Sequence, residues 1–336
     1  MALEPALKRP ALVTSARVLH ETSAPDICNK TGMDLTWTRR EVLAWAAAFT
    51  AGFTSERVQA APERVPAAPQ SAQPRSYAER LRQLEKQSGG RLGVAVLDTA
   101  NGRRFGQRAD ERFPMCSTFK LLASAAVLAR VDRGEERLER RVPFGPSDLL
   151  EHAPVTRAHV AEGGLTLAQL CEAVMVVSDN TAANLLLASL GGPAGLTKYV
   201  RTLGDLRTRL DRNEPTLNEA LPNDERDTTT PNAMLGNLEQ LLLGNALSKA
   251  SREKLSQWMS ASTTGLDRLR KGVPPGWRVG DKTGSGNHGT SNDIAILWPP
   301  AGKPLLITVY LTGTSASADV KNGVFAELAR LVTLPS

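Results

Sequence analysis

The sequence is poor in the residue types that hold metal ions and disulfide bonds. Its 336 residues include three cysteines and four histidines. The cysteines are Cys28, Cys116 and Cys171, with no Cys-x-x-Cys spacing, and the histidines form neither a His-x-His nor a His-Glu-x-x-His pattern. These absences argue against a zinc hydrolase, and we expect no metal and no other cofactor. A disulfide between Cys116 and Cys171 stays open, but two buried free thiols fit the sequence better.

Signatures of nucleic-acid-binding proteins are also missing. The net charge is +6, yet the positive residues are scattered. The densest groups, 137–141 and 268–271, alternate with acids or lie beside candidate site residues. There is no RRM, zinc-finger or helix-turn-helix pattern, so we expect no nucleic-acid partner. Hydrophobic residues at 41% and charged residues at 23% are typical of a globular protein with a real core.

No apolar stretch is long enough to predict a membrane span, although residues 42–53 are apolar. The pair Arg39-Arg40 precedes this stretch, and the small residues Val58-Gln59-Ala60-Ala61 follow it. Together they form an export-signal pattern, and the paired arginines indicate the twin-arginine route. A surface helix with two chance arginines is the alternative interpretation. We therefore expect a leader over 1–60 and a periplasmic or secreted product.

Two further features concern the N-terminal region. Residues 1–32 show no periodicity and precede Met33, which lies at a suitable distance from the paired arginines. We hypothesise that Met33 is the physiological start, which N-terminal sequencing of a precursor that begins upstream would contradict. The Pro/Ala/Gln-rich residues 61–75 indicate a flexible linker, and the folded domain is expected over 76–336.

Patterns within 76–336 predict helices in the middle of the domain and strands at both ends. Helical spacing indicates helices over 77–87, 117–129, 166–177, 180–189, 193–203, 251–259 and 318–332, and one that begins at Thr230-Pro231. Runs rich in β-branched residues indicate strands over 92–97, 277–283, 293–298 and 305–312, and Asn101-Gly102 indicates a hairpin.

This order predicts an α+β fold. One antiparallel sheet is built from both ends of the mature chain (76–112 and 266–336) and flanked by helices, and an all-α subdomain (113–265) is inserted. A cleft between the two parts is the natural place for a ligand. Nothing in the sequence suggests an obligate oligomer, so we expect a monomer.

Four short motifs carry candidate chemistry. The first is Ser117-Thr118-Phe119-Lys120, which places a hydroxyl and an amine on one face of a helix. If the amine is desolvated and neutral, it can take the serine proton and activate a nucleophile. Ser-x-x-Lys is weak evidence alone, because it arises by chance in chains of this length. Burying polar residues at the start of a nearly apolar helix costs free energy unless they have a role, and this strengthens the case for a functional Ser-x-x-Lys motif.

The second and third motifs are Ser178-Asp179-Asn180 and Lys282-Thr283-Gly284. The serine can relay a proton and the asparagine amide can hold a carbonyl, although the motif can equally cap the next helix. The lysine motif ends a predicted strand and can hold an anion, although a lysine that protects an edge strand is as good an explanation.

The fourth motif, Glu214-Pro215-Thr216-Leu217-Asn218, lies in the aperiodic segment 209–227. Irregular segments of this length are usually functional loops. A carboxylate and an amide four residues apart can hold and deprotonate a water, whereas a solvated acidic loop is the alternative. We expect an Arg212 to Asp227 ion pair to close the loop.

Along the chain the four motifs follow one another at 117–120, 178–180, 214–218 and 282–284, and in that order they resemble those of class A serine β-lactamases. The resemblance extends from about residue 76 to the C-terminus. Longer strings share it, namely 178–186, 209–212, 223–229 and 263–265. The resemblance implies acylation and deacylation of a β-lactam. It implies Ser117 as nucleophile, Lys120 and Glu214 as the two candidates for acylation base, and Glu214 with Asn218 for activation of the deacylating water.

The resemblance also implies the residues that bind a small-molecule β-lactam. Ser178 passes a proton to the ring nitrogen, and Asn180 binds the side-chain amide. Lys282, Thr283 and Ser285 hold the substrate carboxylate, and the N–H groups of Ser117 and Ser285 bind the oxyanion.

Two more residues are expected to contact the substrate. Some members place an arginine just after the position of Gly289; this chain lacks it, and Arg268 matches the alternative position. His152 matches a rim position where an aromatic ring is common.

The cysteines depart from the family in two ways. Cys171 matches a position that is disulfide-bonded in some members, but its partner position is Ser124 here. Cys116 resembles a cysteine that pairs, in carbapenem-hydrolysing members, with the position that Gly286 occupies here.

Two other functions share part of this pattern. A D,D-peptidase (penicillin-binding protein) has three of the motifs but lacks the Glu214 and Asn218 pair. A non-catalytic β-lactam sensor domain stays acylated and is normally tethered by a membrane helix. The sequence favours the hydrolase over both.

Overall fold

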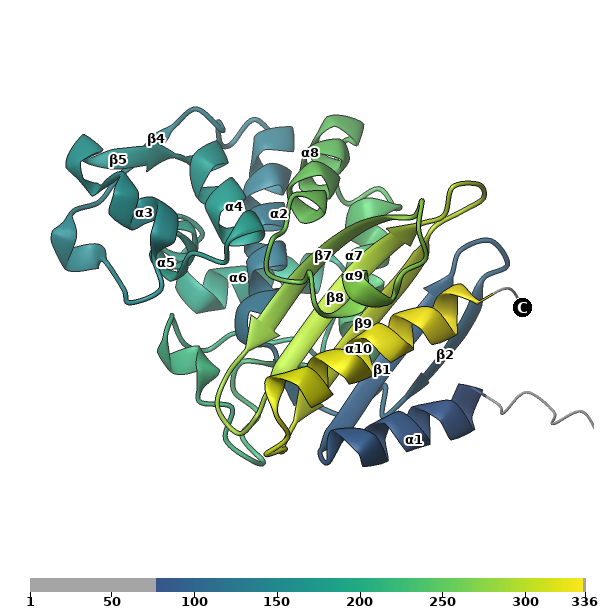
Figure 1. Cartoon of the computed structure of the whole chain (residues 1–336). Helices are drawn as coiled ribbons and strands as arrows, with labels where there is room; N and C mark the ends of the chain where they lie inside the picture. The colour runs from purple at the N-terminus through teal and green to yellow at the C-terminus, as the bar shows by residue number, and fades with distance from the viewer. Residues whose placement is uncertain (1–76, 335–336) are drawn as a thin grey trace, which may run out of the picture. The chain divides into compact units, whose positions relative to one another are not determined.

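The computed structural model describes residues 77–334, which form a five-stranded antiparallel sheet packed between helices (Figure 1). The order across the sheet is β2-β1-β9-β8-β7. The strands are β1 (Arg91–Asp98), β2 (Arg103–Gln107), β7 (Arg278–Ser285), β8 (Ser291–Trp298) and β9 (Leu305–Thr312). The first two strands join the last three through β1 and β9, so both ends of the domain build one sheet, as predicted. The leader and linker predictions (1–60 and 61–75) lie outside the described residues.

Helices of both ends of the domain cover one face of the sheet. They are α1 (Tyr77–Ser88), α9 (Leu269–Gly272) and α10 (Ala318–Thr333), and α10 crosses the near face in Figure 1. Side chains alternate between the faces of a strand, so β9 supplies Ile307 and Val309 to this core and Leu306 and Tyr310 to the opposite one. The sheet is therefore buried on both sides.

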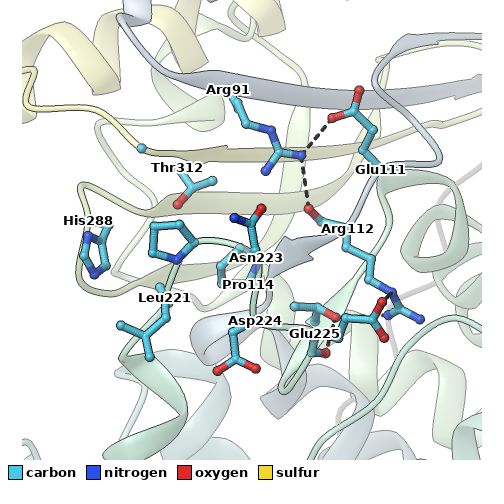
Figure 2. A pocket seen from close by; sticks show the side chains of 14 residues that line it. Arg91, Glu111, Arg112, Pro114, Leu221, Asn223, Asp224, Glu225, His288 and Thr312 are labelled. Carbon is cyan, nitrogen blue, oxygen red and sulfur yellow. Dashed lines mark hydrogen bonds and ion pairs between the residues drawn. The ribbon is translucent and has the colours of Figure 1, made fainter.

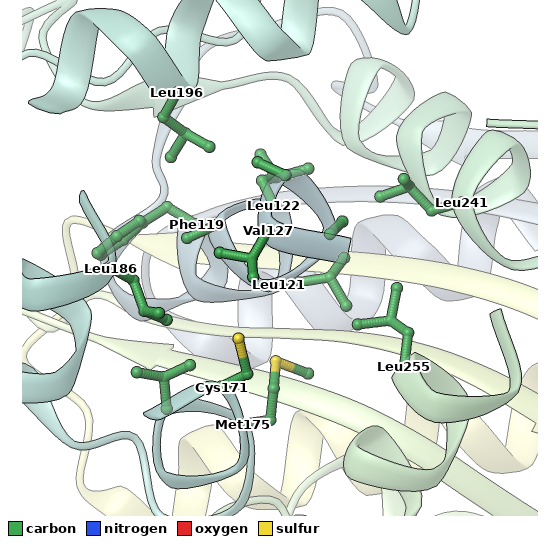
Figure 3. Packing of buried hydrophobic residues seen from close by; sticks show 14 of the residues in the cluster. Phe119, Leu121, Leu122, Val127, Cys171, Met175, Leu186, Leu196, Leu241 and Leu255 are labelled. Carbon is green, nitrogen blue, oxygen red and sulfur yellow. The ribbon is translucent and has the colours of Figure 1, made fainter. Parts of the chain in front are cut away.

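The opposite face carries the inserted part, which is mainly helical. Its helices are α2 (Phe119–Asp132), α3 (Pro154–Ala158), α4 (Leu167–Val176), α5 (Asn180–Ser189), α6 (Gly192–Thr202), α7 (Pro231–Leu242) and α8 (Lys249–Ser260). Helix α2 is buried along residues 119–129, as its almost wholly apolar sequence predicts. Figure 3 shows its leucines packed among side chains of α4, α5, α6, α7 and α8.

Side-chain caps fix several helix ends close to the predicted positions. The N-cap side chains of α4, α5, α7, α8 and α10 each accept a hydrogen bond from a backbone N–H of the first turn; they are Thr166, Asp179, Thr230, Ser248 and Ser317. Helix α7 also has its proline at the first turn.

Short elements that the sequence patterns did not predict complete the inserted part. Strand β3 (Phe113–Pro114) pairs with β6 (Thr228–Thr229), and β4 (Arg141–Pro143) pairs with β5 (Gly164–Thr166). The helix expected from Ser117 begins instead as a 3₁₀ helix, Cys116–Thr118, and continues as α2. Further 3₁₀ turns cover Pro146–Asp148, Val160–Glu162 and Thr216–Asn218. Within residues 77–334, no helix is long and apolar enough to cross a membrane.

Candidate active site

The structure brings Ser117 and Lys120 into direct contact at the start of α2. The Lys120 ammonium nitrogen lies 3.0 Å from the Ser117 Oγ, to which it donates a hydrogen bond. The lysine side chain is fully buried. Burial lowers the pKa of Lys120, while the nearby Glu214 carboxylate opposes this shift. The first motif therefore supplies a hydroxyl and a buried amine within proton-transfer distance.

The second motif surrounds the same amine. The Lys120 Nζ donates to the backbone oxygen of Ser178 at 2.8 Å, to its Oγ at 3.2 Å and to the Asn180 Oδ1 at 2.5 Å. Asp179 points the other way, because its carboxylate caps α5 and accepts from the N–H groups of residues 155 and 156. The motif thus combines both interpretations: Asp179 caps the helix, whereas Ser178 and Asn180 face the nucleophile.

The loop carboxylate reaches the same point. Glu214 Oε1 lies 2.9 Å from Lys120 Nζ, with both side chains fully buried, and 3.4 Å from the Ser117 Oγ. Its other oxygen, Oε2, accepts from the Asn218 amide at 2.5 Å. A buried ion pair loses much of its solvation, so it needs additional polar partners, and Asn218 is one of them.

A residue that sequence reasoning did not assign to the site, Asn184 of α5, holds the Glu214 backbone. Its Nδ2 donates to the Glu214 carbonyl at 3.0 Å, and its Oδ1 accepts from the Glu214 N–H at 2.9 Å. The peptide bond between Glu214 and Pro215 is cis. Asn184 belongs to one of the strings that carry the family resemblance, but no local pattern indicates a bond to a loop thirty residues away.

The predicted ion pair that closes the loop is confirmed. Arg212 Nε lies 2.6 Å from Asp227 Oδ2, and the Asp227 carboxylate is 1% exposed. The other Asp227 oxygen accepts from the N–H groups of Asp211 and Arg212 at 2.7 and 2.9 Å. Arg212 also pairs with Glu219. These bonds tie the two ends of the loop together around Glu214.

The lysine of the third motif lies on β7 and meets the second motif from the sheet side. Lys282 Nζ donates to the Ser178 Oγ at 3.1 Å and to the Thr283 carbonyl at 2.8 Å. Its side chain is fully buried. Burial lowers the pKa of Lys282 to about 7, and the charge of Lys120 contributes. Ser178 thus lies between two lysines, which suits a hydroxyl that relays a proton.

Arg268 faces the end of β7. Its guanidinium donates to the Ser285 Oγ at 2.7 Å and to the backbone oxygens of Gly284 and Asn292 at 2.9 and 2.6 Å. Burial lowers the pKa of Arg268, an arginine that nevertheless stays charged near neutral pH. The structure therefore brings Arg268 together with Ser285, as expected of a residue that helps to bind a carboxylate.

Two neighbouring hydroxyls and one ring complete the arrangement. The Oγ atoms of Thr283 and Thr264 are 2.6 Å apart. His152 is exposed, and its Nε2 lies 3.0 Å from the Val177 carbonyl, while its own backbone oxygen accepts from the Asn180 N–H at 2.9 Å. His152 therefore borders the second motif, but its ring is bonded to the backbone.

Both cysteines in the described part of the chain are buried free thiols, as predicted. Burial raises the pKa of Cys116 to about 12, so the thiol stays protonated near neutral pH. A Cβ placed on Gly286 would lie 2.7 Å from the Cys116 Sγ, so the two positions are adjacent. Gly286 thus occupies the position at which carbapenem-hydrolysing members have the second cysteine of their disulfide. It offers no sulfur to Cys116.

A separate cavity of about 480 Å³ lies next to the loop end, between residues 220–225, β3, the start of β1 and the end of β9. Figure 2 shows Arg91, Arg112 and His288 at its wall. The four motifs contribute none of its lining residues. The chemistry accordingly belongs to the motifs, and not to this cavity.

The family described as the Beta-lactamase enzyme family matches residues 76–333. The solved structure of an ancestral (GNCA) class A β-lactamase is 62% identical, covers 76% of this chain and 97% of its own length, and superposes with a TM-score of 0.75. The chain belongs to the class A β-lactamase family.

Individual β-lactamases of this family are similar over almost their whole length. β-Lactamase CTX-M-8 of Citrobacter amalonaticus is 48% identical over 266 residues, which are 79% of this chain and 91% of the relative. β-Lactamase OXY-2 of Klebsiella oxytoca is 46% identical over 255 residues, 76% of this chain and 88% of the relative. The α+β fold predicted from the sequence is therefore that of a serine β-lactamase.

Proposed function

We propose that the chain hydrolyses the β-lactam amide of penicillins and cephalosporins through an ester on Ser117, and so confers resistance to them. The contact of both Lys120 and Glu214 with the Ser117 hydroxyl supports this most directly. The names of the similar proteins, all β-lactamases, support the substrate class. The string 282–286 with 290–293 looks more like cephalosporin-active relatives than like carbapenem-hydrolysing ones, so cephalosporins are the first substrates to try.

In the acylation step, the Ser117 oxygen attacks the lactam carbonyl as its proton passes to Lys120 or Glu214. Both groups lie within reach of that proton, and both stay candidates for the base. The carbon–nitrogen bond of the ring then breaks, and the nitrogen takes a proton from the Ser178 hydroxyl, which the adjacent lysines resupply.

Substrate contacts are assigned to residues around this centre. Asn180 binds the side-chain amide, and the substrate carboxylate is held by Lys282, Thr283 and Ser285, with Arg268 behind Ser285. His152 borders the acyl side chain. The N–H groups of Ser117 and Ser285 bind the oxyanion of the tetrahedral intermediate.

In the deacylation step, Glu214 takes a proton from a water that Asn218 helps to hold. The hydroxide attacks the ester carbon, and the Ser117 oxygen leaves and regains its proton. The D,D-peptidase alternative lacks this carboxylate and amide pair, and the sensor alternative stays acylated, so the bond between the two side chains at 2.5 Å favours a hydrolase.

The test is Glu214→Ala with a chromogenic cephalosporin. We expect the wild-type protein to turn over many equivalents, and the variant to release one equivalent of product and then retain the acyl group on Ser117, since the base for water is missing. Mass spectrometry of the intact protein detects the added acyl mass.

The matched control is Glu225→Ala, which removes an exposed carboxylate from the same loop, and it should turn over like the wild type. If the Glu214→Ala protein loses its acyl group as fast as the wild type, Glu214 is not the base that activates the deacylating water. A wild-type protein that stops after one equivalent would defeat the hydrolase assignment itself.

We also propose that residues 1–60 direct export to the periplasm or the medium by the twin-arginine route, that residues 61–75 link the leader to the folded domain, and that the exported protein is a monomer. The paired arginines and the short apolar stretch support the route. Changing Arg39 and Arg40 to lysine should leave full-length precursor in the cytoplasm, which fractionation and immunoblotting measure. Normal export of the lysine variant would contradict the route.

A further inference from the structure

The residues that precede the nucleophile are bonded to the sheet by Asn292 of β8. Its side-chain amide nitrogen donates to the backbone oxygens of Pro114 and Met115 at 2.9 and 3.0 Å. Asn292 is fully buried. Both of its N–H groups are thus committed to two consecutive carbonyls, two and three residues before Ser117.

This asparagine is an unfavourable choice for stability alone. Its Oδ1 is buried and has no hydrogen-bond partner among the described residues. An unsatisfied buried acceptor destabilises the folded state, and an apolar side chain of similar volume would avoid that cost. The amide is therefore best explained by what its two N–H groups hold in place.

The segment that it holds has a strained backbone conformation. Cys116, directly before Ser117, has a φ of +44°, which is left-handed and unfavourable for a residue other than glycine. Such a conformation persists only where the surroundings enforce it. Met115 is fixed on both sides, because its N–H donates to the Asp227 carbonyl at 2.9 Å and its own carbonyl accepts from Asn292.

The strained segment, residues 115–117, packs closely against β7. A Cβ placed on Gly284 would be 2.8 Å from the Met115 oxygen and 3.2 Å from both the Ser117 nitrogen and the Asn292 amide. Gly284 and Asn292 are direct partners in the ladder between β7 and β8. The Ser117 N–H therefore lies beside the strand that carries Ser285.

Asn292 is linked to the substrate-carboxylate side as well. Its backbone oxygen accepts from Arg268 at 2.6 Å, and the same guanidinium bonds Gly284 and Ser285. One residue thus connects the segment of the nucleophile with the strand of the third motif.

We infer that Asn292 is a positioning residue that fixes the Ser117 N–H relative to the Ser285 N–H, and so sets the geometry in which the oxyanion is bound. The inference rests on the proposed function. Asn292 acts through residues 114–117 and does not touch the substrate. Acylation and deacylation both pass through a tetrahedral oxyanion, so both steps depend on this geometry.

The experiment compares wild type with Asn292→Leu, which keeps the number and branching of the side-chain heavy atoms and removes both donors. We expect the acylation rate constant for a chromogenic cephalosporin, from stopped-flow kinetics, to fall about 100-fold, since small misplacements at a reacting centre have effects of this size. The affinity for phenylboronic acid, which forms a tetrahedral adduct on a serine, should fall in parallel. The dissociation constant of the unreacted cephalosporin should not change.

Thr308→Val is the matched control. Thr308 is a buried residue of β9 whose Oγ donates to the Pro231 carbonyl at 2.9 Å, so it also bonds the sheet to the inserted part, away from the nucleophile. This variant should have a lower Tm and an unchanged acylation rate. If Asn292 had only a structural role, Asn292→Leu would behave in the same way.

An Asn292→Leu protein with wild-type acylation rate and boronate affinity would overturn the inference, whatever its Tm. If that variant does not fold, Asn292→Ser decides the question, because the hydroxyl keeps one donor; we expect about a tenfold loss, and a wild-type rate would overturn the inference equally. The proposed function fails separately, when the wild-type protein itself is not acylated or does not turn over.

Discussion

At the scale of the residue, the site depends on polar groups that are buried together. Lys120, Glu214 and Lys282 are buried ionisable side chains; Ser178 connects the two lysines, and Lys120 contacts Glu214. Water would weaken the interactions between such charges, and burial strengthens them. Burial also lowers the pKa of both lysines, which gives the site a measurable dependence on pH.

Lys282 should produce an alkaline decline in activity. Burial lowers its pKa to about 7, so the ammonium is present below that pH and is lost above it. We expect kcat/KM for a β-lactam that bears a carboxylate to fall as the pH rises through about 7, because kcat/KM reports the free enzyme. A bound carboxylate stabilises the ammonium, so kcat should decline at a higher pH.

Lys282→Arg is the comparison for this prediction. An arginine stays charged throughout this range, so the decline in kcat/KM should move to a higher pH even if the absolute rate is lower. Steady-state kinetics across the pH range measures both profiles. A wild-type profile that is flat through about 7, or a decline that the arginine variant keeps unchanged, would contradict the assignment to Lys282.

The sequence patterns identified the residues with reactive groups and the Arg212 to Asp227 ion pair, but not the two asparagines that position these groups. Ser117, Lys120 and Glu214 belong to motifs whose spacing carries chemical meaning. Asn184 and Asn292 bond to backbone atoms of segments distant in the sequence, and an isolated asparagine gives no sign of such a partner. Their roles depend on tertiary contacts, which local spacing does not encode.

At the scale of the element, the loop over 209–227 is held by one buried ion pair. Arg212→Ala should remove the partner of Asp227, whose carboxylate is almost fully buried. Leaving such a charge unpaired is expected to cost about 3 kcal/mol of unfolding free energy. Because the loop carries Glu214, deacylation should slow by about 100-fold. Thermal unfolding and single-turnover kinetics measure the two effects.

Arg226→Ala is the control in the same loop. Arg226 pairs with Asp224 at the surface, where solvent screens an ion pair and leaves it little effect on stability. This variant should therefore keep both its Tm and its deacylation rate. If Arg212→Ala deacylates at the wild-type rate, the ion pair does not hold Glu214 in place, and its role is limited to stability.

The elements with long periodic patterns were predicted closely, and the short ones were missed. Helix α10 spans Ala318–Thr333, where the sequence indicated 318–332, and β9 has the predicted bounds. The ladders of β3 with β6 and of β4 with β5 involve two or three residues per strand, too few for an alternation to be visible. The 3₁₀ start at Cys116 follows from its left-handed backbone, which tertiary bonds impose.

At the scale of the whole molecule, the parts of the site either belong to the sheet or are hydrogen-bonded to it. The nucleophile is bonded to it through Asn292, the third motif is part of it, and the loop reaches it where the Asn287 N–H donates to the Asn218 carbonyl at 2.9 Å. The strand patterns at both ends of the domain predicted this sheet. That the four motifs form one site was predicted only by the resemblance to a family.

The pairing of β1 with β9 has a consequence for synthesis on the ribosome. All eight residues of β1, from Arg91 to Asp98, pair with residues 305–312, so the centre of the sheet cannot form before residues 305–312 have been synthesised. Contacts between such distant residues raise the contact order and slow folding. A nascent chain in which residues 305–312 have not yet left the ribosome therefore exposes the apolar faces of β1, and the native sheet forms only after these residues emerge.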